Sequence, residues 1–338
     1  MPDRLTTMLQ EREWILTDGA TGTNLIAMGL TQGYPPEQWN FEQPDKVRAH
    51  YRSFIEAGSD LVLTNTFGGT ANRLKLHKAE DKTYEVNKVA AELLCEEIAA
   101  CSREVVCAGS IGPTGDLFQP NGDLTYEEGV AAFAEQIRGL KDGGVDVVWI
   151  ETMFDEQELR AALEAAASHE VPAVYTMSFD TSGRTMMGLT PSYCIQLAKS
   201  VSPRPIACGG NCGTGAPDLI AGLISAQEQI GPDDVIVAKA NCGIPEMTDD
   251  GIRYNGTPEL MADYVRLARD AGARIIGGCC GTTPGHIAVM REALERHQKG
   301  PCPTLEATIE TLGPLTGTTR SLIEGGGPPR SKRRRRQG

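Results

Sequence analysis

The sequence predicts an α/β protein built as a (β/α)8 barrel, also called a TIM barrel, with a C-terminal extension. Between residues 14 and 297, apolar segments rich in valine and isoleucine alternate eight times with amphipathic segments of helical periodicity. The apolar segments lack polar alternation, as expected for parallel strands that helices bury on both faces. Eight such units in a chain of 338 residues fit a closed barrel better than an open sheet.

Each unit is expected to begin with a strand and to continue into a helix. The predicted strands are 14–17, 60–64, 105–110, 146–151, 173–178, 205–210, 235–240 and 273–278. The predicted helices are 45–57, 84–100, 126–142, 156–168, 191–200, 216–229, 258–271 and 284–297. Proline opens several of these helices, as is typical of the first helical position.

An open doubly wound sheet is the alternative fold. It would require a glycine fingerprint for a dinucleotide after the first strand, and Asp18-Gly-Ala-Thr-Gly-Thr23 lacks that spacing. We therefore expect a barrel over residues 1–298 and an extension over residues 299–323 that wraps the barrel or meets another subunit. Residues 324–338 are expected to form a disordered basic tail.

Composition and charge argue against several classes of protein. The net charge of -13 disfavours binding to phosphate backbones, so no nucleic-acid partner is expected. Residues 330–336 carry six positive charges, which fit a disordered tail, with a nucleic-acid or membrane tether as the alternative. The first 13 residues lack the apolar run of a secretory signal, and no segment approaches the roughly 20 apolar residues of a membrane span. We expect a cytoplasmic protein with no membrane partner.

Polar side chains gather where the predicted strands end, which is where barrel enzymes place their chemistry. The eight ends carry Asp18-Gly-Ala20, Thr64-Asn-Thr-Phe67, Gly109-Ser-Ile-Gly-Pro-Thr114, Glu151-Thr152, Ser178-Phe-Asp180, Gly209-Gly-Asn-Cys212, Asn241-Cys-Gly243 and Gly277-Gly-Cys-Cys-Gly281. The strand interiors carry almost none of these residue types. This segregation predicts one active face.

Three of these strand ends carry cysteine. The sixth, seventh and eighth strands are neighbours in a barrel, so four thiols are expected in one sector of the rim: Cys212, Cys242, Cys279 and Cys280. In a reducing compartment, clustered thiols are more often metal ligands than disulfides. Zn²⁺ favours thiolates, and a catalytic zinc site takes three protein ligands and leaves a fourth position open. The flanking glycines permit the backbone geometry that turns adjacent cysteines to one side.

The positions of the other cysteines and of the histidines also favour an all-thiolate metal site. The remaining six cysteines are expected to be structural, and all five histidines lie away from strand ends. A zinc hydrolase or lyase would need histidine ligands and a base that activates water. An all-thiolate site is poor at making hydroxide and is suited to hold a substrate thiolate while leaving it nucleophilic. Cys242 could support the ligands or compete with them.

Together these motifs resemble the homocysteine S-methyltransferase domain, and the chain is most similar to bacterial betaine–homocysteine methyltransferases. The resemblance rests on Asp18-Gly-Ala-Thr-Gly-Thr23, Thr64-Asn-Thr-Phe67, Gly109-Ser-Ile-Gly-Pro113, Glu151-Thr152, Gly210-Asn-Cys212 and Gly277-Gly-Cys-Cys-Gly-Thr282. It runs from about residue 11 to residue 297. It implies a (β/α)8 barrel with one zinc ion and an enzyme that methylates homocysteine to methionine.

The residues that the resemblance implies fall into two sets. The zinc ligands are Cys212, Cys279 and Cys280. The homocysteine pocket holds Asp18 and Glu151 near the amino group, Gly19 and Ala20 through their backbone, and Thr64 and Ser110 in its lining. No catalytic residue is implied beyond the zinc site. Zinc would keep the thiol of homocysteine ionised, and the thiolate would attack the methyl group of a positively activated donor.

The methyl donor is less well specified. The chain carries neither a cobalamin-binding motif nor a second barrel for folate, and it resembles enzymes that use small onium donors, of which betaine is the first candidate. Aromatic faces bind quaternary ammonium groups, and Tyr34, Trp39 and Phe67 are candidates. The alternatives are dimethylsulfoniopropionate, S-methylmethionine or a separate methylcorrinoid protein. A non-enzymatic zinc- or thiol-sensing protein is a remote alternative, and the extension leaves a homo-oligomer open.

Overall fold

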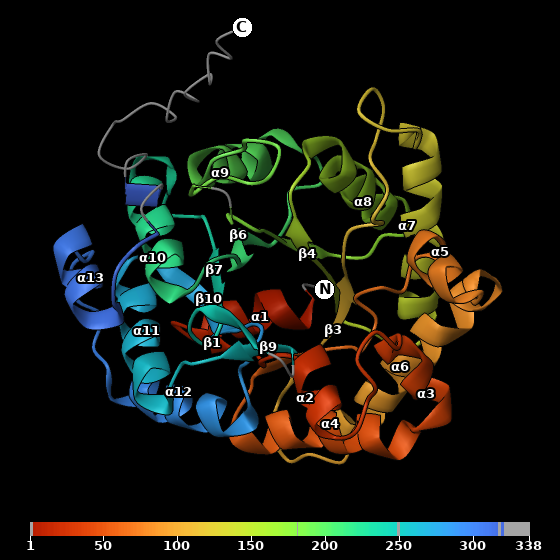
Figure 1. The fold of residues 1–338 in the computed structure, drawn as a ribbon, viewed down its shortest axis with the longest axis horizontal. Coiled ribbons are helices and arrows are strands. Elements are labelled where there is room, and N and C mark those ends of the chain that lie inside the picture. Colours follow the sequence, from red (N-terminus) through yellow and green to blue (C-terminus); the bar gives the residue numbers. More distant parts are fainter. Residues whose placement is uncertain (1–2, 181, 249–250, 317–318, 321–338) are drawn as a thin grey trace, which may run out of the picture.

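The computed structural model describes residues 3–180, 182–248, 251–316 and 319–320, which form a barrel of parallel strands ringed by helices (Figure 1). The barrel strands are β1 (Ile15–Leu16), β2 (Leu61–Leu63), β3 (Val106–Ile111), β4 (Val147–Met153), β5 (Ala173–Met177), β6 (Ala207–Cys212), β7 (Ile236–Ala240) and β10 (Ala273–Gly278). The outer helices are α4 (Pro44–Ala57), α6 (Thr83–Ala99), α7 (Tyr126–Asp142), α8 (Glu156–Ser168), α9 (Pro191–Ser200), α10 (Ala216–Ser225), α11 (Pro258–Asp270) and α12 (Pro284–Arg296). The predicted fold class is confirmed.

The barrel closes through its first two strands. The pairing order is β1-β10-β7-β6-β5-β4-β3-β2, with every pair parallel. A parallel bridge between Thr17 and Leu61 joins the two ends of this order. The Asp60 N–H also donates to the Leu16 carbonyl at 2.7 Å. This closure excludes the open doubly wound sheet.

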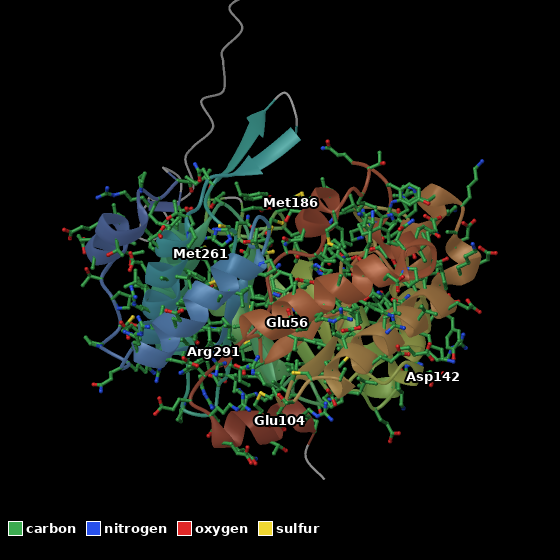
Figure 2. The ribbon with its side chains drawn as sticks, turned by 90° about the horizontal axis from the view of Figure 1, so that it is seen from below. Glu56, Glu104, Asp142, Met186, Met261 and Arg291 are labelled. Carbon is green, nitrogen blue, oxygen red and sulfur yellow. The ribbon has the colours of Figure 1, made fainter. Side chains whose placement is uncertain are left out.

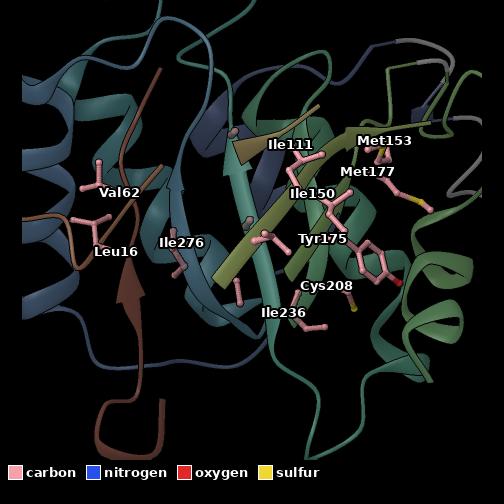
Figure 3. Packing of buried hydrophobic residues seen from close by; sticks show 14 of the residues in the cluster. Leu16, Val62, Ile111, Ile150, Met153, Tyr175, Met177, Cys208, Ile236 and Ile276 are labelled. Carbon is pink, nitrogen blue, oxygen red and sulfur yellow. The ribbon is translucent and has the colours of Figure 1, made fainter. Parts of the chain in front are cut away.

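Two apolar layers hold the barrel together. Successive strand residues face opposite sides of the sheet, so each strand contributes to both layers. The barrel interior is filled by side chains that include Leu63, Ala108, Trp149, Val237 and Ile275. The layer between the strands and the helices includes Leu16, Val62, Ile150, Tyr175 and Ile276 (Figure 3). Because both layers are apolar, a polar side chain inside the barrel needs a partner there.

A helix that the sequence analysis did not predict, α1 (Arg4–Glu11), closes the N-terminal end of the barrel. Its Leu5, Met8 and Leu9 are buried in the interior cluster. The Asp3 carboxylate caps the helix by accepting from the Thr6 N–H at 2.8 Å. The segment is polar on average, and only the spacing i, i+3, i+4 of its apolar residues signals a helix.

The C-terminal end of the barrel carries a second unpredicted element. An antiparallel hairpin, β8 (Pro245–Thr248) and β9 (Gly251–Tyr254), stands between β7 and α11 and projects from the end of the barrel opposite α1 (Figure 2). Shorter helices on the loops are α2 (Gly22–Ala27), α3 (Trp39–Glu42) and α5 (Ala71–Leu74), with 3-10 turns at Pro36–Gln38, Lys75–His77, Glu80–Lys82 and Gln227–Gln229. Apart from the Gln227–Gln229 turn, which follows α10 and precedes β7, these insertions lie on the loops after the carboxyl ends of the strands.

In the described part of the predicted extension, α13 (Leu305–Leu312) packs against α10 and α11. Thr308 and Leu312 are buried, and the Thr316 hydroxyl donates to Asp218 of α10 at 2.7 Å. The predicted basic tail lies outside the described residues. Across the described chain, no helix combines the length and the apolar character needed to cross a membrane.

Candidate active site

The thiols of Cys212, Cys279 and Cys280 form a cluster at the carboxyl ends of β6 and β10. Their sulfur atoms all lie within 4.8 Å of one another, and the Sγ atoms of Cys212 and Cys280 are 4.0 Å apart. Each of the three residues is half-buried. The fold therefore brings together the three residues that were predicted as ligands.

The backbone around the cluster explains how these side chains converge. Cys212 has a φ of 60°, in the left-handed region, where an L-residue is held at a cost of about 1–3 kcal/mol. After β10, Gly281 has a φ of 79°, which glycine adopts without strain. A Cβ on Gly278 would lie 2.3 Å from the Thr282 side chain, so only glycine fits there. The flanking glycines thus allow the backbone geometry that the sequence analysis expected beside Cys279 and Cys280.

Two asparagines support the cluster from neighbouring strand ends. The Asn211 side chain donates to the Thr152 hydroxyl at 2.8 Å and faces the Cys279 sulfur at 3.7 Å. The Asn241 side chain accepts from the Cys280 N–H at 3.1 Å. Hydrogen bonds of this kind fix the orientation of potential ligands and tune their basicity.

The three thiols also share hydrogen bonds, and these bonds divide the negative charge unevenly. Hydrogen bonds from Cys212 and Cys279 lower the pKa of Cys280 to about 3, with a further hydrogen bond from Tyr254 at the end of β9. The same hydrogen bonds hold the pKa of Cys212 well above its ordinary range. The cluster thus stabilises a thiolate, the form of cysteine that binds soft metal ions.

Cys242 does not belong to this cluster. Its side chain is buried, and its thiol faces the Gly256 carbonyl at 3.5 Å, at the base of the hairpin. Burial raises its pKa to about 11. Its backbone N–H donates to the Cys280 carbonyl at 2.9 Å. Cys242 therefore connects the hairpin to the loop of Cys280 without adding a fourth thiol to the group.

The cluster faces a cavity of about 510 Å³ at the C-terminal end of the barrel. Its inner wall contains Gly19, Ala20, Thr64, Ser110, Glu151 and Lys239 together with the three clustered cysteines. Its outer wall contains Tyr34, Glu37, Phe67, Arg73, Leu76 and His77. All but one of the residues predicted to bind a substrate therefore line the same space as the thiols.

Glu151 is the carboxylate exposed to the inner part of the cavity. It is buried at the end of β4 and accepts a hydrogen bond from the Ser110 hydroxyl at 2.6 Å. The Thr64 hydroxyl in turn accepts from the Ser110 N–H at 3.0 Å, which fixes Ser110. Burial raises the pKa of Glu151 to about 7, an effect that the charge of Lys239 partly offsets. A buried carboxylate whose only hydrogen-bond partner is neutral is suited to receive a cationic group.

Asp18 is the predicted pocket residue that does not line the cavity. Its side chain is 1% exposed, and its two oxygens accept from Lys239 Nζ at 2.8 Å and from the Leu63 N–H at 2.8 Å. Burial raises the pKa of Asp18, whereas Lys239 opposes that rise. Asp18 thus stands behind the cavity wall, and Lys239 lies between it and the cavity.

Lys239 is the residue that the sequence analysis missed. It lies within β7, and its Nζ lies 5.5 Å from the centre of the Trp149 ring inside the barrel. Strand interiors were taken as apolar, so the residue was assigned no role. A single lysine in a strand expected to be buried on both faces was the available signal, because such a charge must have a partner.

The outer wall offers aromatic faces and two unlike charges. Phe67 and Tyr34 are 38% and 39% exposed. Glu37 is buried and accepts from the Gly68 N–H at 2.6 Å, and burial raises its pKa. Arg73 forms no ion pair among the described residues, but its charge partly offsets the rise in the pKa of Glu37.

Trp39, the third aromatic candidate, is not part of this wall. It is 6% exposed, and Lys46 Nζ lies 4.6 Å from the centre of its ring. It is absent from the residues that line the cavity. Its position on α3 turned the indole toward the core, which its place in a polar loop sequence did not reveal.

Comparisons with known proteins show the family and the fold to which the chain is similar. A family model described as homocysteine S-methyltransferase matches residues 15–294. The homocysteine methyltransferase MmuM from Escherichia coli has a similar fold. Its metallated form is 23% identical with a TM-score of 0.72, and its oxidised form is 23% identical with a TM-score of 0.73. Each match covers 86% of this chain and 99% of the MmuM chain.

The fold, the thiol cluster and the family match together define the protein as a methyltransferase. More particularly, the chain belongs to the homocysteine S-methyltransferase family. The resemblance found in the sequence is thereby confirmed at the level of the family.

Proposed function

We propose that this protein transfers a methyl group from a small zwitterionic onium compound, with betaine as the first candidate, to the sulfur of homocysteine, and that it does so with a bound zinc ion. One observation carries the proposal: three clustered thiols and the charged groups Glu151 and Lys239 face the same cavity. This combination matches an amino acid that carries a thiol.

The thiol cluster fits a zinc ion. Zinc–sulfur bonds are about 2.3 Å long, so two sulfurs on one tetrahedral zinc lie about 3.8 Å apart. The 4.0 Å between the sulfurs of Cys212 and Cys280 is close to this value. We assign Cys212, Cys279 and Cys280 as the ligands. A zinc ion held by three thiolates keeps a substrate thiol in its nucleophilic form at neutral pH.

The protein's own residues position the acceptor. Glu151 receives the ammonium group of homocysteine. The Ser110 hydroxyl donates to the Glu151 carboxylate and fixes its orientation. Thr64 and the backbone of Gly19 and Ala20 shape the wall beside the substrate. The sulfur electron pair forms the bond to the methyl carbon, the carbon–nitrogen bond of betaine breaks, and its electron pair stays on dimethylglycine. The thiol proton passes to solvent, and most of the acceleration comes from orientation.

The outer wall supports a small zwitterionic donor over a protein donor. A cationic methyl-bearing group would lie against Phe67 and Tyr34 with the buried carboxylate of Glu37 nearby. Arg73, which forms no ion pair among the described residues, is available for the donor's carboxylate. Betaine carries both charges, as do dimethylsulfoniopropionate and S-methylmethionine. A methylcorrinoid protein would not use these two charges.

The decisive test compares donors with and without metal. We would assay methionine formation from homocysteine with betaine, dimethylsulfoniopropionate, S-methylmethionine and methylcobalamin, before and after chelation and with zinc restored. The proposal expects the highest rate with betaine, loss of activity on chelation and recovery with zinc. Activity that survives complete removal of the metal would overturn the zinc assignment, and a rate that is highest with methylcobalamin would overturn the donor.

Spectroscopy separates an enzyme from a sensor. X-ray absorption at the zinc edge should show one additional sulfur neighbour when homocysteine is added. A site whose coordination does not change on addition of homocysteine would favour the thiol-sensing alternative.

All ten cysteines are free in the structure, which supports a reducing compartment such as the cytoplasm.

A further inference from the structure

Lys239 is a buried cation that faces the cavity, and the steps of the proposed methyl transfer give it no contact with the substrate. Its side chain is 2% exposed and crosses the barrel interior from β7. Taking an ammonium group out of water is unfavourable unless partners inside the protein compensate. Among the described residues, Asp18 is the group that accepts a hydrogen bond from its Nζ, at 2.8 Å. An ammonium has three N–H donors, so the pair with Asp18 leaves donor capacity unused.

Because Lys239 lines the cavity, its unused N–H donors are available to a ligand there. Lys239 lines the inner wall from β7, and Glu151 lines it from β4. Two strands, β5 and β6, lie between β4 and β7 in the barrel. No ion pair joins the two side chains among the described residues, and Glu151 bonds instead to Ser110 at 2.6 Å. The inner wall thus presents a cation and a carboxylate that do not neutralise each other directly.

We propose that Lys239 binds the α-carboxylate of homocysteine while Glu151 binds its α-ammonium group. In this arrangement Asp18 is a positioning residue that holds Lys239 toward the cavity without touching the substrate. The proposal rests on the proposed function, because it concerns the same acceptor. It differs from the role that the sequence resemblance implied for Asp18, because Asp18 is 1% exposed, is paired with Lys239 and does not line the cavity.

The chemistry of the acceptor agrees with this division. A free amino acid carries opposite charges on groups attached to one carbon atom, and each must replace its lost water in a buried site. Glu151 and Lys239 offer one charge of each sign. A site that reads both charges should select homocysteine over simple thiols, because a missing group leaves a buried charge unpaired. Lys239 is therefore a residue that determines acceptor specificity.

The test uses the zinc-loaded full chain and two thiol acceptors. L-homocysteine has both charges, whereas homocysteamine, its decarboxylated analogue, has only the ammonium. We expect the wild type to favour homocysteine in kcat/KM by about 100-fold. Lys239→Met should bring this ratio towards one, because the methionine side chain has similar length and no charge. Both acceptors carry the ammonium group that Glu151 binds. An indirect effect of the substitution on Glu151 therefore acts on both acceptors and cancels in the ratio.

A second variant separates binding from folding. Lys239→Met alone leaves the buried carboxylate of Asp18 unpaired and could unfold the protein. The double variant Lys239→Met with Asp18→Asn removes both charges and should restore the melting temperature. Selectivity should stay lost in the double variant. Asp18→Asn alone keeps the lysine but weakens the contact that positions it, so its selectivity should lie between those of the wild type and the double variant.

Calorimetric binding of homocysteine and homocysteamine, without any donor, gives a readout independent of catalysis. The variants should lose about 100-fold in affinity for homocysteine relative to homocysteamine. If the double variant folds and retains the wild-type ratio, Lys239 is only a structural partner of Asp18 and the inference is overturned. If the wild type transfers no methyl group to either thiol, the proposed function fails, and the binding ratio still decides the role of Lys239.

Discussion

Two buried aspartates, at opposite ends of the barrel, face very different surroundings. Asp60 precedes β2 at the N-terminal end, is 1% exposed, and accepts from three arginines at 2.9 Å each: Arg12, Arg103 and Arg291. It also accepts from the Leu16 N–H at 3.0 Å. Asp18, at the C-terminal end, forms an ion pair with one lysine, Lys239. Figure 2 shows Arg291 below, away from the hairpin.

The comparison separates stability from function. Around Asp60 every charge has a partner in the protein, and the arginines reach solvent. Near Asp18, Glu151 has only a neutral hydrogen-bond partner, and burial raises its pKa to about 7 although the charge of Lys239 opposes the rise. Barrel proteins use the N-terminal end for stability and the C-terminal end for chemistry. At the N-terminal end the carboxylate of Asp60 is paired with arginines. At the C-terminal end the carboxylate of Glu151 has no ion pair among the described residues and can bind a ligand.

The largest effect is expected at the thiol cluster. Cys280→Ala should lower kcat/KM for methyl transfer by more than about 100-fold, because loss of a ligand should exceed the loss caused by residues that only orient ligands. Zinc content, measured by mass spectrometry, should fall in parallel. Cys302→Ala is the matched control, because Cys302 is exposed, follows α12 and is not part of the thiol cluster. This variant should keep the wild-type activity and zinc content. Equal activity in the two variants would contradict the assignment.

Glu151→Gln should lower kcat/KM for homocysteine by about 10- to 100-fold, the loss expected for one charge-assisted hydrogen bond. Because burial raises the pKa of Glu151 to about 7, its ionised fraction rises between pH 6 and pH 8, and homocysteine affinity should rise with it. The variant should lack this rise. A pH profile of kcat/KM that keeps the same limb in the variant would argue against Glu151.

The same shift sets a sign for stability. A carboxyl whose pKa is raised on folding favours its protonated form in the folded state, so its ionisation costs the folded protein stability as pH rises from about 4.5 towards 7. Without substrate, thermal melts of wild type and Glu151→Gln should therefore diverge over this interval, with the variant the more stable near neutral pH.

Asp60→Asn should affect stability and leave the reaction intact. Removing one partner of buried ion pairs costs about 3 kcal/mol, and the partly exposed arginines limit the loss. Urea unfolding measures this change. The kcat of the folded fraction should match the wild type, and a selective loss of kcat would show that the two ends are coupled.

The smallest effect is expected at the outer wall. Arg73→Met should raise KM for betaine by about 10-fold, because one charged contact to the donor's carboxylate is lost. KM for homocysteine should stay constant, since Arg73 belongs to the outer part of the cavity. Lys75→Met, on the next turn of the same segment, is the control. A change in the homocysteine KM alone would place the donor elsewhere.

The sequence by itself determined the fold class and the thiol site. Eight apolar segments with intervening amphipathic helices have one common arrangement, and glycines beside Cys279 and Cys280 marked a constrained backbone. These are local signals, because periodicity and residue type at a strand end do not depend on distant contacts.

Only the tertiary structure decided which charges meet. Asp18 and Lys239 are separated by 221 positions in the chain, so no local pattern could show that they pair. The helix α1 and the hairpin β8–β9 gained their places from packing at the two ends of the barrel. Because of this long-range pairing, Asp18 lies behind the cavity wall and Lys239 is the cation that lines the cavity. The cysteines could be recognised from sequence because each lies at a strand end, whereas Lys239 required the barrel to close around it.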